Sequence, residues 1–196
     1  MKLRVSFILL AVAFTGSSFQ SQKDAGETVN WQPGSKLIWK DFKKQLKDGG
    51  QEAAFTVCGI SISSNPSQMD DATVTVDVHS FFSKTLSGKT TNSAHLNNVL
   101  LKHEQDHFDL AELYTRKLRK DIMDAHFKTI PGFYKSLKEL YNKENAALLA
   151  EQQKYDKETN HSLNASEQDK WNGAIADALS KYGDYVNAQV KVEIRK

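Results

Sequence analysis

Residues 100–110 of the chain read Leu100-Leu101-Lys102-His103-Glu104-Gln105-Asp106-His107-Phe108-Asp109-Leu110. Inside it, His103 and His107 stand four residues apart and Glu104 directly follows the first, which is the pattern His-Glu-x-x-His. On a helix, residues four apart lie on the same face, so both imidazoles could bind one zinc ion while Glu104 faces the water on that ion. The pattern therefore predicts the metal site of a zinc peptidase.

The residues around the motif have helical periodicity and predict a helix over residues 92–126. A lone histidine on an apolar stripe is more often a core side chain bonded to a backbone carbonyl, but two at this spacing with Glu104 between them favour a metal site. The stripe, with intervals of three or four residues, consists of Leu96, Leu100, His103, His107, Leu110, Tyr114 and Leu118.

Two further helices are expected towards the C-terminus. Pro131 and Gly132 interrupt the helical pattern, and a second helix follows over residues 134–157, which are rich in Ala, Leu, Glu, Gln and Lys. After a polar loop, Ser166 and Asp169 have the spacing of an N-terminal capping box. The third helix then carries the apolar residues Trp171, Ile175 and Leu179.

Strands are predicted at both ends of the mature chain. Residues 55–63 and 72–82 have strand-like composition or alternation, and residues 186–194 alternate strictly between apolar and polar side chains. The turn between the first two strands is predicted at Asn65, Pro66 and Ser67. The expected fold is α+β, with a small antiparallel sheet packed on about three helices, one of which is a zincin-like His-Glu-x-x-His helix.

The N-terminus predicts a secretory signal peptide over residues 1–18. Lys2 and Arg4 precede an apolar run over residues 5–14, which is too short for a permanent membrane-spanning helix, and small and polar residues follow. Cleavage near Ser18 would leave one domain over residues 19–196, which is long enough to form its own core. We expect an exported protein, periplasmic or secreted, without a stable membrane anchor.

Charge and cysteine content exclude several classes of protein. Removal of Lys2 and Arg4 brings the formal net charge from +2 to near zero, so we expect no nucleic-acid partner and no membrane-surface patch. Cys58 is the single cysteine, which rules out an intramolecular disulfide. Its apolar surroundings favour burial over reactivity.

A catalytic zinc takes three protein ligands, and the third is less clear than His103 and His107. His161 is the first choice, because it follows a helix that could fold back across the motif helix and bring this loop to the metal. Asp156 is the alternative, either as the ligand or as the group that orients a ligand histidine. Weaker options are Glu112, His126, Glu144 and Glu151.

Two residues are candidates for catalysis. Glu104 could accept a proton from the attacking water and deliver it to the leaving amine. Tyr155 could donate a hydrogen bond to a developing oxyanion, although a tyrosine is more often a packing residue. The other reading of Glu104 is an exposed helix glutamate.

The motif region resembles the signature of an uncharacterised bacterial family described as secreted zinc-dependent proteases. Residues 101–114 carry this resemblance, as do residues 38–42 and 53–56 and the later block 155–161 with Gln168 and Trp171 behind it. The resemblance covers nearly the whole mature chain and implies a zinc site and peptide cleavage. One departure is Ser162, where that family often has glycine; glycine would permit a positive φ that serine adopts reluctantly.

The sequence thus predicts an exported zinc metallopeptidase that acts on peptide or protein substrates. Two alternatives remain open: an exported protein that binds zinc without catalysis, and a zinc amidohydrolase that acts on cell-wall material. Glu104 distinguishes catalysis from structural binding, because a structural site needs no carboxylate beside its histidines and usually fills all four positions with protein ligands.

Overall fold

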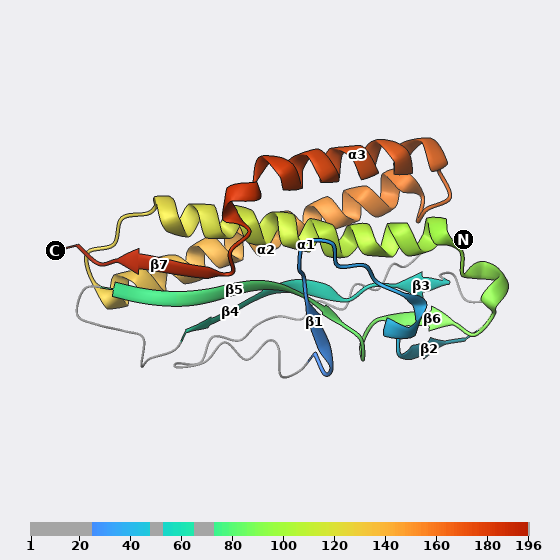
Figure 1. Ribbon diagram of the computed structural model, residues 1–196, viewed down its shortest axis with the longest axis horizontal. Helices are drawn as coiled ribbons and strands as arrows, with labels where there is room; N and C mark the ends of the chain where they lie inside the picture. Colours follow the sequence, from blue (N-terminus) through green and yellow to red (C-terminus); the bar gives the residue numbers. More distant parts are fainter. Residues whose placement is uncertain (1–24, 48–52, 65–72, 196) are drawn as a thin grey trace.

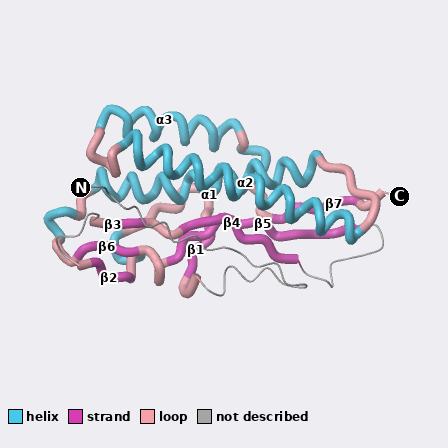
Figure 2. The backbone as a smooth tube through the Cα atoms, turned by 180° about the vertical axis from the view of Figure 1, so that it is seen from behind, coloured by secondary structure: helices cyan, strands magenta, loops and turns pink. Residues whose placement is uncertain are grey.

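A computed structural model describes residues 25–47, 53–64 and 73–195, and its elements form two layers (Figures 1 and 2). The helices α1 (Asn98–Asp124), α2 (Ile130–Thr159) and α3 (Ala165–Lys181) lie on one side, and the strands lie on the other. The predicted α+β fold with three helices is confirmed.

The larger sheet is antiparallel and is built around the long strand β5 (Thr73–Ser83). Strand β4 (Cys58–Ser64) pairs with one edge of β5. The other edge is shared by β1 (Thr28–Asn30) and β7 (Gln189–Glu193), which pair with opposite ends of β5. The alternation in the sequence places one face of β5 in the core, since Val74, Val76 and Val78 are fully buried.

A second, three-stranded sheet was not predicted. In it, β6 (Gly88–Thr90) pairs in parallel with β2 (Lys44–Leu46) and in antiparallel with β3 (Ala54–Phe55). These strands have only two or three residues, which is too short for an alternating pattern to be visible in the sequence.

Several predicted boundaries were wrong. Helix α1 covers Asn98–Asp124 rather than residues 92–126, because the extended backbone at Asn97 and Ala125 ends it on both sides. The predicted strand over residues 55–63 is divided between β3 and β4, which belong to different sheets. Helix α2 begins at Ile130, since Pro131 fits the first turn of a helix, where its missing N–H needs no partner. Asn164, not Ser166, caps α3, because its side chain accepts from the backbone N–H of Glu167. Strand β7 begins at Gln189 rather than at residue 186, because Val186 still has helical backbone angles at the end of the 3₁₀ turn η5 (Gly183–Tyr185).

The predicted signal peptide at 1–18 and the turn at Asn65, Pro66 and Ser67 lie outside the described residues. Among the described residues, no helix combines the length and the apolar character that crossing a membrane requires.

Within the helical layer, α1 contacts the larger sheet as well as α2 and α3. It starts at the cap residue Asn97, whose side chain accepts from the backbone N–H of Leu100. From His103 to Arg116 all its residues are buried except the half-buried Asp109. Many of these side chains are polar, so each needs a partner inside the protein.

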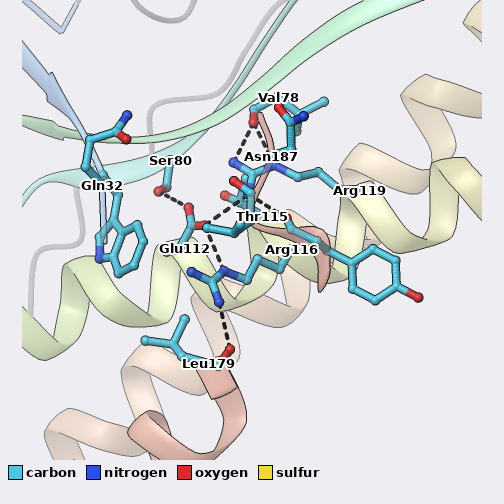
Figure 3. A network of polar contacts seen from close by, with 12 residues as sticks. Gln32, Val78, Ser80, Glu112, Thr115, Arg116, Arg119, Leu179 and Asn187 are labelled. Carbon is cyan, nitrogen blue, oxygen red and sulfur yellow. Dashed lines mark hydrogen bonds and ion pairs between the residues drawn. The ribbon is translucent and has the colours of Figure 1, made fainter. Parts of the chain in front are cut away.

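The C-terminal half of α1 meets this need with a buried ionic network (Figure 3). One oxygen of Glu112 accepts from Arg116 and Arg119, and the other accepts from the Ser80 hydroxyl at 2.7 Å. Arg119 also donates to the backbone oxygen of Val78 in β5 through Nε and Nη2, at 2.9 and 2.7 Å. The network joins α1 to the sheet.

Arg116 and Arg119 extend the same network to the C-terminal part of the chain. Arg116 donates to the backbone oxygen of Leu179 near the end of α3, and Arg119 donates to that of Tyr185 in η5. These bonds hold α3 and the chain that leads into β7 against α1.

We expect Glu112→Gln to lower the free energy of unfolding by about 3–5 kcal/mol, because two buried guanidinium groups would lose the charge that offsets them. Chemical denaturation followed by circular dichroism measures the change. Asp124→Asn, the corresponding acid-to-amide substitution at an exposed position of α1, is the control and should change stability little. Equal, small effects of both variants would contradict a stabilising role of the network.

Candidate metal centre

Four elements bring polar side chains together near the N-terminal half of α1. This helix supplies His103, Glu104 and His107, the last turns of α2 supply Tyr155 and Asp156, the turn after α2 supplies His161, and α3 supplies Gln168. In Figure 1 the α2–α3 turn lies at the same end of the molecule as the start of α1. The fold thus brings His161 and Asp156, the two candidates for the third ligand, to the histidines of the motif.

The carboxylate of Asp156 lies close to three imidazoles. Its Oδ1 lies 3.2 Å from His103 Nε2, 2.9 Å from His107 Nε2 and 3.8 Å from His161 Nδ1. Ligand-type atoms of His103, Asp156 and His161 all lie within 4.8 Å of one another. With zinc–ligand bonds near 2.0–2.1 Å, neighbouring donors of a tetrahedral site stand roughly 3.3 Å apart, which is close to these separations.

The site also contains buried polar atoms that lack hydrogen bonds. In the part of the chain that the structure describes, the buried side-chain nitrogen and oxygen atoms without a hydrogen-bond partner are Glu104 Oε2, His107 Nδ1 and Asp156 Oδ1, although Asp156 Oδ1 faces the His103 and His107 nitrogens at ion-pair distance. Leaving such an atom unpaired costs about 1–3 kcal/mol, so a cluster of them calls for an explanation such as a bound ion. The donor set and its unpaired oxygen therefore fit a divalent cation.

Charges in the cluster shift the pKa values of its members in opposite directions. Burial acts to raise the pKa of Asp156, but His107 and His103 outweigh it and hold that pKa well below its usual range. Burial acts to lower the pKa of His107, and the Asp156 carboxylate outweighs it and raises that pKa. The cluster is thus built around a negative oxygen that attracts positive charge.

Glu104 differs from Asp156 in its surroundings. Its side chain is buried, and this burial raises the pKa of its carboxyl, with His107 and His103 offsetting part of the effect. The reading of Glu104 as an exposed helix glutamate is therefore wrong. A carboxyl with a raised pKa can take and return a proton near neutral pH.

His161 is more exposed than the other candidate for the third ligand, with 34% of its side chain accessible against 15% for Asp156. It lies in a left-handed turn, where Asn160, His161 and Ser162 have φ values of 48°, 51° and 72°. Left-handed conformations are costly for residues other than glycine. Ser162, which stands where the family that the motif resembles often has glycine, adopts a positive φ despite being a serine.

Tyr155 packs against the histidines from the buried side of the site. Its ring stacks on that of His103 with 4.6 Å between centroids, and its side chain is fully buried. Its hydroxyl accepts from Gln168 Nε2 at 2.7 Å and lies within 3.4 Å of Asp106 Oδ2. This placement favours packing, and an oxyanion role for Tyr155 stays a prediction without support from the geometry.

The weaker ligand candidates lie elsewhere. Glu112 binds Arg116 and Arg119, Glu144 pairs with Lys143, His126 is exposed, and Glu151 is next to Tyr114.

The chemistry of Cys58 also agrees with the expectation from the sequence, since burial raises the pKa of its thiol to about 12 and keeps it protonated.

Gln168 is the residue of the site whose role the sequence did not reveal. Its Oε1 lies 3.1 Å from His103 Nδ1, and its side chain is buried. The available signal was its position on the apolar stripe of α3, three residues before Trp171 and seven before Ile175. A polar residue on such a stripe needs a buried partner.

Comparison with known families gives one match. The family described as "Bacterial protein of unknown function (DUF922)" matches residues 36–162, which include all the candidate ligands and Glu104 but not Gln168. No curated protein and no solved structure matches the chain.

We expect Ser162→Gly to raise the free energy of unfolding by about 1 kcal/mol, because glycine relieves the cost of the left-handed backbone. Thermal and chemical denaturation measure the change. Ser166→Gly in the first turn of α3 is the control and should lower stability, since glycine is a poor helix former. A loss of stability in both variants would show that Ser162 does not adopt a left-handed conformation in solution.

Proposed function

This chain belongs to DUF922, a bacterial protein family of unknown function, and we propose that it is an exported zinc-dependent metallopeptidase that hydrolyses peptide bonds. One observation carries the proposal: a buried glutamate with an unpaired oxygen, Glu104, lies beside a cluster of four potential zinc ligands. Export rests on the sequence of residues 1–18.

The ligands we propose are His103, His107, Asp156 and His161. Asp156 Oδ1 lies within 3.2 Å of both helix histidines, so it is the stronger candidate for the third ligand. His161 is more exposed and farther from the centre of the cluster, which makes it the group that a substrate or water could replace. A zinc ion held there would polarise a substrate carbonyl and lower the pKa of a water molecule.

Glu104 would move the protons of the reaction. Its carboxylate would accept a proton as the water oxygen bonds to the carbonyl carbon of the peptide. It would give that proton to the amine nitrogen as the carbon–nitrogen bond breaks, so water is added across the bond. Burial favours both steps, because it raises the pKa of the carboxyl. The free-energy difference between its protonated and deprotonated forms near neutral pH is then smaller.

A specific observation also favours the second candidate, a zinc-binding protein without catalysis. Asp156 Oδ1 lies within 3.8 Å of a nitrogen of each of three histidines, and a zinc site that keeps four protein ligands is of the structural kind. Glu104 weighs against this alternative, because a structural site gains nothing from a buried carboxyl without a partner. The third candidate, an amidohydrolase acting on cell-wall material, needs the same residues and differs only in substrate.

Substitution of the ligands tests the metal site. We expect the purified chain to bind about one zinc ion, and His103→Ala or His107→Ala to abolish binding. Asp156→Ala should weaken binding at least about a hundredfold and His161→Ala about tenfold. Competition with a chelator measures the affinities, and His126→Ala, at an exposed histidine beyond the end of α1, is the control. Unchanged affinity in His103→Ala would exclude this site, and a larger loss in His161→Ala than in Asp156→Ala would make His161 the third ligand.

Substitution of Glu104 tests catalysis. Glu104→Gln keeps the shape of the side chain but cannot take the proton, so hydrolysis should fall by about a hundredfold or more while zinc affinity stays nearly unchanged. Cleavage of casein, a peptide library and cell-wall fragments provides the assay, with Glu139→Gln at an exposed position of α2 as the control.

The outcomes of this assay separate the candidates. Peptide cleavage that depends on Glu104 supports a peptidase, and cleavage of cell-wall amides alone supports the amidohydrolase. Zinc binding without any cleavage supports a binding protein. Normal hydrolysis by Glu104→Gln would show that Glu104 is not the general base.

A further inference from the structure

The contact between Gln168 and His103 joins α3 to the candidate metal centre. Gln168 Oε1 lies 3.1 Å from His103 Nδ1, on the side of the ring away from Asp156, and both side chains are only 2% exposed. The two residues are 65 positions apart in the sequence. Neither can exchange this partner for water without opening the interface of α1 with α3.

The orientation of the Gln168 amide follows from its other contacts. Its Nε2 lies 3.1 Å from Asp106 Oδ2, 2.7 Å from the Tyr155 hydroxyl and 2.8 Å from the side-chain amide of Asn172. The Asp106 carboxylate, which also pairs with Lys102, is an acceptor, and the tyrosine hydroxyl can accept as well. The NH₂ group therefore faces these two oxygens, and Oε1 faces the histidine.

An amide oxygen accepts a hydrogen bond and cannot donate one, so Nδ1 of His103 must carry the hydrogen. In a neutral imidazole the other nitrogen, Nε2, then holds a lone pair. Nε2 is the atom that faces Asp156 Oδ1 at 3.2 Å, inside the ligand cluster. The chain of contacts from Asp106 through Gln168 thus prepares His103 to bind a cation.

We propose that Gln168 is a positioning residue of the metal centre, which holds His103 in the Nδ1–H tautomer and presents its Nε2 to the cation. The consequence for metal binding rests on the proposed function; the tautomer itself does not. Asp106, one of the two variable residues of the His-Glu-x-x-His pattern, orients Gln168 and so takes part in the same task. The site therefore extends beyond residues 36–162, which the family shares, into α3.

His107 provides an internal comparison. Its Nδ1 is buried and has no hydrogen-bond partner among the described residues. Its Nε2 lies 2.9 Å from Asp156 Oδ1, closer than that of His103 at 3.2 Å. Loss of Gln168 should therefore alter the tautomer of His103 and leave that of His107 as it is.

The test is nuclear magnetic resonance of the full, metal-free chain labelled with ¹⁵N, since couplings within the imidazole ring tell which nitrogen carries the hydrogen. In the parent, at a pH at which His103 is neutral, this ring should be the Nδ1–H tautomer, because Gln168 Oε1 can accept only from Nδ1 whereas Asp156 Oδ1 can accept from His107 Nε2 instead. In Gln168→Leu, Nδ1 loses its acceptor, and the hydrogen should move to Nε2, where Asp156 Oδ1 can accept it. Zinc affinity should fall about ten- to a hundredfold, as for other groups that orient ligand histidines, and the absorption bands of the cobalt-substituted protein should shift.

Two further variants separate positioning from general stability. Trp171→Phe changes a buried residue one turn further along α3 that contacts Tyr155 and donates to Glu158. It should lower the melting temperature without altering the His103 tautomer or zinc affinity. Asp106→Asn combined with Gln168→Glu exchanges donor and acceptor, since the new amide on α1 would donate to a carboxylate on α3 that still accepts from His103. This pair should restore the tautomer and most of the affinity.

The outcomes are distinct. A His103 that keeps the Nδ1–H tautomer in Gln168→Leu would overturn the proposal, and so would a change of tautomer with unchanged zinc affinity. If Gln168→Leu does not fold, Gln168→Met, which has nearly the shape of glutamine, gives the same comparison. A third outcome is that Gln168→Leu changes the His103 tautomer but the parent chain binds no zinc. This result would overturn the proposed function and would support the contact between Gln168 and His103.

Discussion

The burial of helix α1 is the constraint on which the rest of the structure depends. From His103 to Arg116 this helix is enclosed by the sheet, α2 and α3, yet its sequence contains histidines, acids and arginines as well as apolar residues. A buried polar group without a partner costs free energy, so the surrounding elements must supply one for each. Helices α2 and α3 and strand β5 lie where they can supply these partners.

The two halves of α1 meet the constraint differently, and the difference locates the site. In the C-terminal half, both oxygens of Glu112 are paired, and Arg116 and Arg119 reach backbone oxygens of β5, α3 and η5. In the N-terminal half, Glu104 and His107 each keep a buried atom without a hydrogen bond, and Asp156 of α2 lies beside them with an oxygen that faces His103 and His107. A fully paired network holds a fold together, whereas a cluster of unpaired ligand-type atoms is suited to bind something.

The same region also contains unusual backbone. Three successive residues, Asn160, His161 and Ser162, are left-handed, and this conformation directs the chain from the end of α2 into α3. The turn places His161 beside Asp156. It also directs α3 so that Gln168 reaches His103. Local strain and buried unpaired atoms occur together here, as is common where a structure serves function rather than stability.

The sequence by itself determined the elements whose pattern repeats along the chain. The stripe of α1, the alternation in β5 and the motif with His103, Glu104 and His107 are visible because a regular element places side chains at fixed intervals. The short strands β2, β3 and β6, the start of α2 at Ile130 and the cap at Asn164 depend on local geometry that a pattern of this kind does not show. Only the tertiary structure decided that Asp156 lies between the histidines and that Gln168 completes the site, because contacts between residues far apart in the sequence depend on how the helices pack.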